Sequence, residues 1–266
     1  MRGSKKRRAE EMWQGFRVRM RLLSPLHIGA RTVGSLKQTR RYVAGRAIWG
    51  AVASRLARDE MGENYARAEK WVDENLRYSY WYVSDGAEQV RMWPWAGGDR
   101  FAWRHLGSYA STALADGRAK QDGSLHETEY LAPVTREGLG VYLHGLMWVQ
   151  GRDRPPGATQ VGGERTYGWG RLGEMECEEA KGEVEWGGWR WREKDGDVRV
   201  RGGKAVLAHA VASGVEGEGR LEALVGRTTK DDEFGRRFSE AVISWAPGSE
   251  ARGEYRVGRF GIWKRV

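Results

Sequence analysis

The segment VGGERTYGWGRL, residues 161–172, restricts the fold more than any other stretch of the chain. It holds four glycines and two arginines in twelve positions. Glycine weakens helices and strands because it loses much conformational freedom on folding, so the segment predicts a loop or a tight β-turn. Glycines also let backbone N–H groups approach an anion closely. These residues alone are compatible with an anion-binding loop and with a purely structural β-bulge.

The spacing of these glycines excludes two familiar nucleotide motifs. It matches neither the GxxxxGK[ST] phosphate loop nor the GxGxxG dinucleotide fingerprint. A nucleotide-hydrolysing enzyme of the phosphate-loop class and a Rossmann enzyme are therefore disfavoured.

The stretch FRVRMRLL, residues 16–23, alternates apolar and basic side chains, which predicts a half-buried strand. Its open face carries Arg17, Arg19 and Arg21. Like charges on one face repel unless water or an anion lies over them. We therefore include these three arginines among the candidate anion-binding residues.

Helices and strands are interleaved over the first 180 residues, which predicts an α+β fold with a split βαβ pattern. Apolar residues at helical spacing predict helices over 44–62, ending near Gly62, and over 64–76. A glycine-interrupted helix is predicted over 100–120, and the paired prolines predict a loop at 151–157. Strands are predicted over 77–85 with 87–95 as a partner, and over 129–134, 139–150 and 171–179.

The pattern changes after residue 180. Short strands joined by a KDGD turn are predicted over 182–203, and a strand pair over 253–266. Residues 204–215 fit a helix or a buried strand, and 231–245 begin with a helical pattern. We predict three parts: a basic flexible tail (1–13), a mixed domain (14–180) and a β-rich extension (181–266), the last a candidate for subunit contact.

The charge balance favours a polyanionic partner. The chain of 266 residues has a formal charge of +9, a pI of about 9.7 and 14 tryptophans, and aromatic rings with arginine suit unstacked bases. One cysteine, Cys177, excludes an internal disulfide framework and a cysteine-built zinc site. No apolar run reaches the roughly 20 residues of a membrane helix. We expect a soluble, cytoplasmic protein with no membrane contact, no metal and no other cofactor.

Three motifs follow one another along the chain: SPLHIGA (24–30), YVAGRAIWGAVASRLA (42–57) and VGGERTYGWGRL (161–172). Together they resemble the RAMP superfamily, the ferredoxin-like RNA-binding subunits of CRISPR–Cas effector complexes, those of type III especially. The matching positions are Leu26, Ile28 and Gly29; Tyr42, Gly45, Ile48, Gly50 and Ala51; and Gly162, Gly163, Arg165, Gly168, Gly170 and Arg171.

The resemblance implies a ferredoxin-like (RRM-like) domain with a glycine-rich loop over 14–180 and an antiviral function. The chain departs from the family at Ala44 and Arg46, where relatives have proline and serine. The stretch RDRPPGATQ stands where a second helix usually precedes the glycine loop. Relatives that cut target RNA carry an aspartate after the first strand, but residues 29–41 contain no acidic residue. The resemblance therefore implies a non-catalytic subunit that holds guide RNA through backbone contacts.

The expected RNA-binding residues form one predicted surface made of the glycine loop, the arginine face of the first strand and the start of the first helix. The expected partners are guide RNA, other effector subunits and target RNA. The residues are Arg17, Arg19, Arg21, Lys37, Arg40, Arg41, Gly45, Arg46, Gly162, Gly163, Arg165, Tyr167, Gly168, Trp169, Gly170 and Arg171.

Two other functions stay open. Relatives that process CRISPR transcripts use a histidine as acid or base, and His27 lies near the first strand, where it could reach RNA. The second open function is that of a scaffold subunit that contacts only other proteins. The tryptophans of WGGWRW, residues 186–191, suit base stacking, a core or a neighbouring subunit equally.

Overall fold

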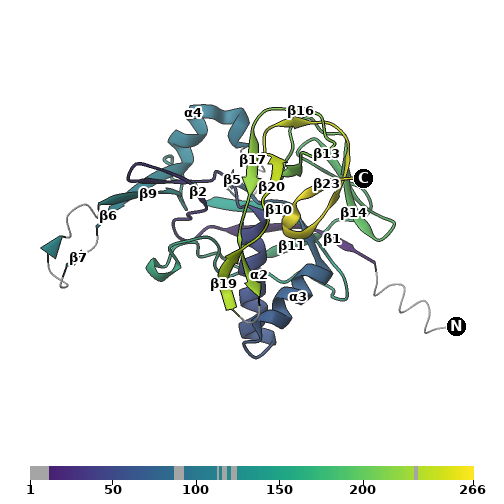
Figure 1. Cartoon of the computed structure of the whole chain (residues 1–266), viewed down its shortest axis with the longest axis horizontal. Helices are drawn as coiled ribbons and strands as arrows, with labels where there is room; N and C mark the ends of the chain where they lie inside the picture. The colour runs from purple at the N-terminus through teal and green to yellow at the C-terminus, as the bar shows by residue number, and fades with distance from the viewer. Residues whose placement is uncertain (1–11, 87–92, 113, 116–118, 121–124, 231–232) are drawn as a thin grey trace.

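The computed structural model describes residues 12–86, 93–112, 114–115, 119–120, 125–230 and 233–266. Its centre is a sheet of five strands with the order β11-β1-β10-β4, in which β5 also pairs with β10 (Figure 1). These strands are β1 (Gln14–Arg21), β4 (Leu76–Tyr78), β5 (Tyr82–Asp85), β10 (Val141–Val149) and β11 (Glu176–Glu179).

Two helices cover one face of this sheet, α2 (Gly45–Glu60) and α3 (Tyr65–Asn75), and both were predicted from the sequence. The apolar side chains of β1, such as Val18 and Met20, pack with Ile48 and Val52 of α2 in one buried cluster. The alternation of apolar and basic residues in β1 therefore buries one of its faces, as expected.

No α-helix lies between β10 and β11. Residues 150–175, all described, hold only a short 3-10 turn, Arg165–Tyr167. The loop predicted at 151–157 is confirmed, because adjacent prolines lack the N–H groups that a helix needs.

A second sheet packs on the other face of the central sheet. Its order is β12-β13-β14-β22-β23-β15-β20-β17. The ring of Trp148 in β10 stacks on that of Trp191 with centroids 5.5 Å apart. The strands are β12 (Val184–Trp186), β13 (Trp189–Lys194), β14 (Asp197–Arg201), β15 (Ala210–Val211), β17 (Leu221–Leu224), β20 (Val242–Trp245), β22 (Glu254–Val257) and β23 (Trp263–Arg265).

The tryptophans of residues 186–191 belong to the core of this second layer. Trp189 and Trp191 have no exposed surface and Trp186 is buried. Of the three roles open from the sequence, the core role is correct, and these rings are not available to stack on bases. The KDGD turn between β13 and β14 and the β22–β23 pair are also as predicted.

Three predicted elements differ from the structure. Residues 100–120 contain the end of α4 (Pro94–His105) and then β6 (Leu106–Ser111), which pairs with β9 (His126–Leu131). Residues 233–245 form β19 (Glu233–Phe238) and β20 rather than a helix. In both stretches strand pairing outweighs the local helical pattern: β6 pairs with β9, β20 with β17, and β19 forms a hairpin with β18 (Arg227–Lys230). Only β15 is regular within 204–215, and the predicted strand over 87–95 falls mostly outside the described residues, with Pro94 and Trp95 in α4.

An arm of four strands extends to one side of the molecule, on the left in Figure 1. Its order is β2-β3-β9-β6, with the small pair β7–β8 beyond it. The bounds not yet given are β2 (Gly29–Val33), β3 (Leu36–Thr39), β7 (Leu114–Ala115) and β8 (Ala119–Lys120).

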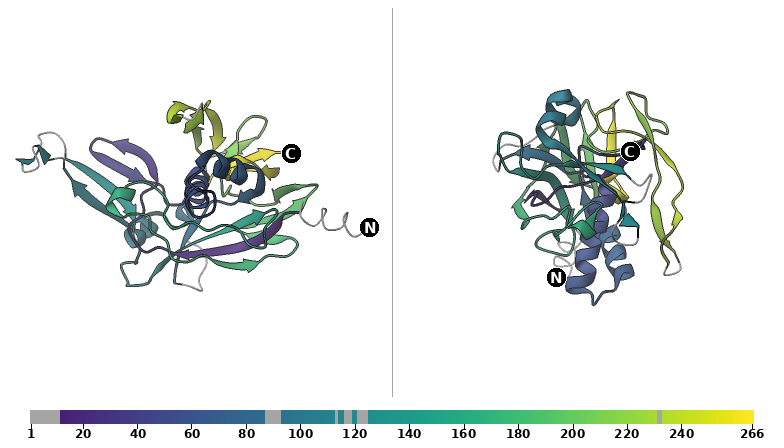
Figure 2. Two further views of the ribbon diagram at one scale, coloured as in Figure 1. Left: turned by 90° about the horizontal axis from the view of Figure 1, so that it is seen from below. Right: turned by 90° about the vertical axis from the view of Figure 1, so that its left-hand side faces the viewer.

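The C-terminal part also passes over the helices. Figure 2 (left) shows α2 and α3 between the central sheet and the pair β18 (Arg227–Lys230) and β19. A further small pair, β16 (Gly217–Glu218) with β21 (Glu250–Ala251), completes the fold. The helices are thus covered on two sides.

The predicted tail, 1–13, lies outside the described residues up to residue 11. Trp13 is buried, and its Nε1 donates a hydrogen bond to the carbonyl oxygen of Gly196 at 2.8 Å. None of the described helices is long and apolar enough to cross a membrane.

Candidate nucleic-acid interface

The glycine-rich segment forms a loop whose base is bonded to the segment SPLHIGA. Gly170 N donates to Pro25 O at 2.7 Å, and Gly163 N donates to His27 O at 2.9 Å. The first and third motifs of the sequence are therefore neighbours in space, although more than a hundred residues separate them.

Glycine is required within this loop. Gly162, Gly168 and Gly170 have positive φ angles. A Cβ on Gly170 would lie 1.8 Å from Val161 O, a distance that no side chain tolerates. The loop, which we call the glycine loop (161–172), owes its path to these residues.

Arg165 lies on the pocket side of the glycine loop. Its Nε donates to Gly162 O at 3.0 Å. Burial and then the nearby Arg58 lower the pKa of its guanidinium. The guanidinium charge of Arg165 is therefore less hydrated than it would be in open water.

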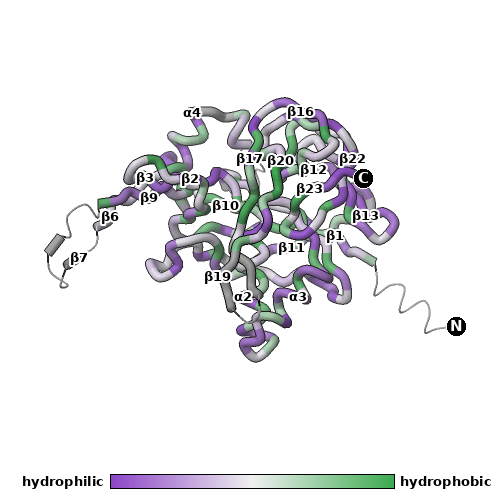
Figure 3. The backbone as a smooth tube through the Cα atoms, in the orientation of Figure 1, coloured by the Kyte–Doolittle hydropathy of each residue, from purple (hydrophilic) through white to green (hydrophobic). Residues whose placement is uncertain are grey.

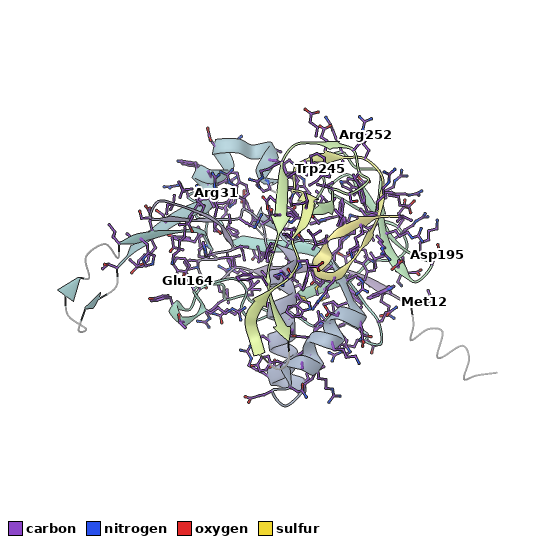
Figure 4. The ribbon with its side chains drawn as sticks, in the orientation of Figure 1. Met12, Arg31, Glu164, Asp195, Trp245 and Arg252 are labelled. Atoms are coloured by element: carbon purple, nitrogen blue, oxygen red, sulfur yellow. The ribbon has the colours of Figure 1, made fainter. Side chains whose placement is uncertain are left out.

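An aromatic group lies on the arm side of the same loop. Trp169 packs edge-on against Tyr130 of β9, with centroids 5.2 Å apart, and is 6.3 Å from Tyr109 of β6. Tyr109 is 59% exposed and Tyr167 is 76% exposed. Figure 4 places Glu164, next to Arg165, on the same side of the molecule as Arg31 of the arm. Tyr109 and Tyr130 were missed from the sequence because the stretch around Tyr109 was interpreted as a helix.

A pocket of about 570 Å³ lies between the glycine loop, the start of α2 and the C-terminal strands. We call it the basic pocket. Among the described residues that line it, Glu240 is the only carboxylate. Figure 3 shows that β17 and β20, which border it, are hydrophobic strands. Its cationic lining residues are Arg40, Arg46, Arg165, Arg259 and Lys264.

The turn Arg259–Gly261 closes against the start of α2. A Cβ on Gly45 would lie 1.7 Å from Phe260 O, so glycine is needed for this approach. Phe260 has a φ of 59°, in the left-handed region that a bulky residue rarely adopts. The guanidinium carbons of Arg46 and Arg259 lie 4.2 and 4.5 Å from the centroid of its ring. Burial and the charge of Arg259 lower the pKa of Arg46, so two like charges share a confined place.

Five polar side chains form a continuous network beside the basic pocket. Tyr80 Oη is 2.8 Å from His209 Nδ1, and His209 Nε2 is 3.0 Å from Glu222 Oε2. Arg40 donates to Glu222 Oε2 at 2.8 Å and to Tyr42 Oη at 2.9 Å. The hydrogen bond from His209, with those from Arg40, lowers the pKa of Glu222 to about 2, whereas burial lowers the pKa of His209. A neutral His209 that donates to Glu222 and accepts from Tyr80 satisfies every member of the chain.

The structure brings four of the predicted residues together in the basic pocket: Arg40, Arg46, Gly162 and Arg165. The other predicted residues of the glycine loop and of α2 do not line it. Lys37 lies 3.8 Å from Glu164, and Arg41 lies over the ring of Phe101. Arg171 is exposed at the base of the glycine loop, where its backbone N binds Ser24 Oγ at 2.9 Å.

The prediction that the β1 arginines share this surface is wrong. In β1 they alternate with the residues that pack under α2, so they point to the opposite face of the sheet. Arg17 donates to Glu185 O of the second sheet at 3.3 Å, and Arg19 pairs with Glu176. Arg21 borders a separate hollow with Arg154. The alternation predicted a shared face for the three arginines, but not the layer that partly covers it.

His27 is buried at the base of the glycine loop. Its Nδ1 is 2.8 Å from Glu129 O, and its own carbonyl oxygen accepts from Gly163. The first contact ties His27 to the arm and the second ties it to the glycine loop, so the residue packs between the two.

Comparisons with known proteins identify the fold of the chain. No protein-family model matches the chain, and no curated protein matches it in sequence. A chain in the cryo-EM structure of Type III-B Cmr-beta bound to cognate target RNA and AMPPnP superposes with a TM-score of 0.53 and 12% identity, over 88% of this chain and 85% of that one. The chain has the fold of this Type III-B Cmr-beta chain.

Two further similarities have TM-scores below 0.5. A chain of Type III-B Cmr-beta bound to cognate target RNA gives a TM-score of 0.39 at 12% identity, over 66% of this chain and 65% of that one. A CRISPR protein from Archaeoglobus fulgidus gives 0.40 at 12% identity, over 91% and 94%. At these TM-scores neither adds to the fold assignment.

Proposed function

We propose that the chain is a non-catalytic RNA-binding subunit of a type III CRISPR–Cas antiviral effector complex that holds guide RNA through backbone contacts. In this proposal the central sheet and its two helices are a ferredoxin-like RAMP domain. The chain order β1, helix, β4, β10, β11 with the sheet order β11-β1-β10-β4 supports it, because this is the split βαβ pattern with its second helix replaced by a loop.

The observation that carries the proposal is the meeting of the glycine loop and the start of α2 at a cation-lined pocket beside an aromatic group. Guanidinium groups and bare backbone N–H groups bind phosphates without regard to base sequence. Trp169 and Tyr167 offer flat faces for unstacked bases, each worth about 1–3 kcal/mol. Other effector subunits and target RNA are the further partners we propose.

The test removes the two arginines of the glycine loop. We expect R165A combined with R171A to weaken the binding of single-stranded guide RNA by about 10- to 100-fold, because two charge-assisted contacts are lost. Fluorescence anisotropy at moderate salt measures the dissociation constant. The control is R252A with R256A, which removes the same charge from exposed positions outside the basic pocket. Unchanged binding by the loop variant would overturn the proposal.

The proposal of no catalysis has its own test. The backbone hydrogen bond of His27 and the absence of acidic residues from 29–41 support it. Incubation with repeat RNA in EDTA, and with guide and target RNA in Mg²⁺, is expected to leave both RNAs intact. Metal-independent cleavage that H27A abolishes would instead establish a guide-processing ribonuclease.

A further inference from the structure

The basic pocket has the size of a small-molecule site and two kinds of wall. Its volume, about 570 Å³, lies within the range of roughly 300–1,000 Å³ that ligand pockets occupy. One wall is apolar: Leu224 and Val242 are register partners on β17 and β20, and Val225 follows. The other holds the cations around the turn Arg259–Gly261.

Among the described residues that line the pocket, cations outnumber carboxylates. Arg40 is paired with Glu222, and Arg259 with Asp73 at 2.8 Å. Lys264 and Arg165 add two further cations, against Glu240 as the only lining carboxylate of the described residues. The two guanidinium groups at the ring of Phe260 are like charges, and an anion bound beside them would be stabilised by both. A phosphate offers several acceptor oxygens to guanidinium groups, so it suits this place better than a neutral group does.

Two features indicate that the space is kept open. Gly50 lies in the interior of α2 and lines the pocket, and a Cβ at this position would meet nothing within 4 Å. Neither packing nor backbone angle requires glycine there, although glycine is a poorer helix former than alanine. Phe260 holds its left-handed backbone at the same pocket, and strained residues of this kind gather at ligand sites.

We propose that the basic pocket binds a single nucleotide, with its phosphate on Arg46, Arg259 and Lys264 and its base against the apolar wall of β17 and β20. The inference rests on the proposed function in one respect: RNA held by the glycine loop is the expected source of the nucleotide. A free nucleotide has the same chemistry, and the experiment separates the two sources.

The first experiment fills the pocket without disturbing the helix. G50L places a side chain in open space and replaces a poor helix former with a good one, so the melting temperature should not fall. We expect wild-type protein to bind AMP in isothermal titration calorimetry, adenosine at least 10-fold more weakly, and G50L to lose AMP binding by at least 10-fold. The matched control, G50A, leaves most of the volume free and should bind AMP.

The second experiment identifies the source. If the nucleotide comes from RNA, G50L weakens single-stranded RNA binding by about 10-fold; if it is free, G50L loses AMP but binds RNA as wild type does. No AMP binding at millimolar concentration together with unchanged RNA binding by G50L would overturn the inference. Failure of the proposed function is a separate result, because it appears as unchanged RNA binding by the loop variant R165A with R171A.

Discussion

At the scale of single residues, the glycine loop depends on positions where a side chain has no room. Gly170 combines a φ of 75° with the close approach of Val161 O, whereas Gly168 has a φ of 78° and open space around it. The two positions therefore separate the cost of backbone strain from the cost of a steric clash.

We expect G170A to destabilise the protein by about 3 kcal/mol or more, since it adds a clash to the left-handed strain. G168A should cost only about 1 kcal/mol, the strain alone. Urea unfolding monitored by tryptophan fluorescence gives both free energies. Equal values for the two variants would contradict the role assigned to Gly170.

A second residue-scale prediction concerns His144 on β10. Burial and the neighbouring Arg19, despite the opposing charge of Glu176, lower the pKa of His144 to about 4. The unfolded chain therefore takes up a proton near pH 6.5 that the folded chain refuses, so the free energy of unfolding falls as the pH drops from about 6.5 to 4 and is unaffected above 7.

The expected size is about 1.4 kcal/mol per pH unit in that window. H144Q should remove this contribution, so the slope of unfolding free energy between pH 6 and 4.5 should be smaller in the variant. An unchanged slope would show that His144 is not held neutral in the folded protein.

At the scale of elements, sequence patterns predicted the conformation of single strands and helices, but not which other elements pack over them. The alternation in β1 and the helical spacing in α2 and α3 are local, and all three elements formed. Strand β6 was missed because its own residues have a helical pattern, and pairing with β9 decided its conformation. The glycine loop followed from its motif, whereas its contact with SPLHIGA and the basic pocket did not, since about half of the residues that line the pocket lie in the C-terminal part of the chain, between 209 and 264.

The contact between the two sheets carries the element-scale prediction. Trp191 of β13 is fully buried between Trp148 and Trp263. We expect W191A to cost about 3–5 kcal/mol, the usual penalty for truncating a buried large aromatic residue. W103A, at a position 57% exposed, is the control and should cost less than about 1 kcal/mol by the same urea titration. A similar small loss for W191A would mean that the second sheet is not packed as described.

At the scale of the whole molecule, a charge of +9 attracts RNA to every face, so affinity alone does not locate the interface. Arginines occur on both sides of the central sheet, those of β1 on one and those of the glycine loop and the basic pocket on the other. The structure pairs Arg17 and Arg19 with neighbouring groups of the protein itself. The proposed function places the phosphate contacts on the glycine-loop side.

The salt dependence of binding tests this assignment, because each phosphate contact on a single strand contributes about 0.7 to the slope of log K against log salt concentration. Removing two true contacts, with R165A and R171A, should lower the slope by about 1.4. Removing the same charge from the other face, with R17A and R21A, should reduce affinity at low salt through the general field but leave the slope near that of the wild type. Titrations of single-stranded RNA at several salt concentrations give all three slopes. Equal reductions in both variants would place RNA on both faces, whereas a reduction only in the β1 variant would move the interface to the opposite side of the sheet.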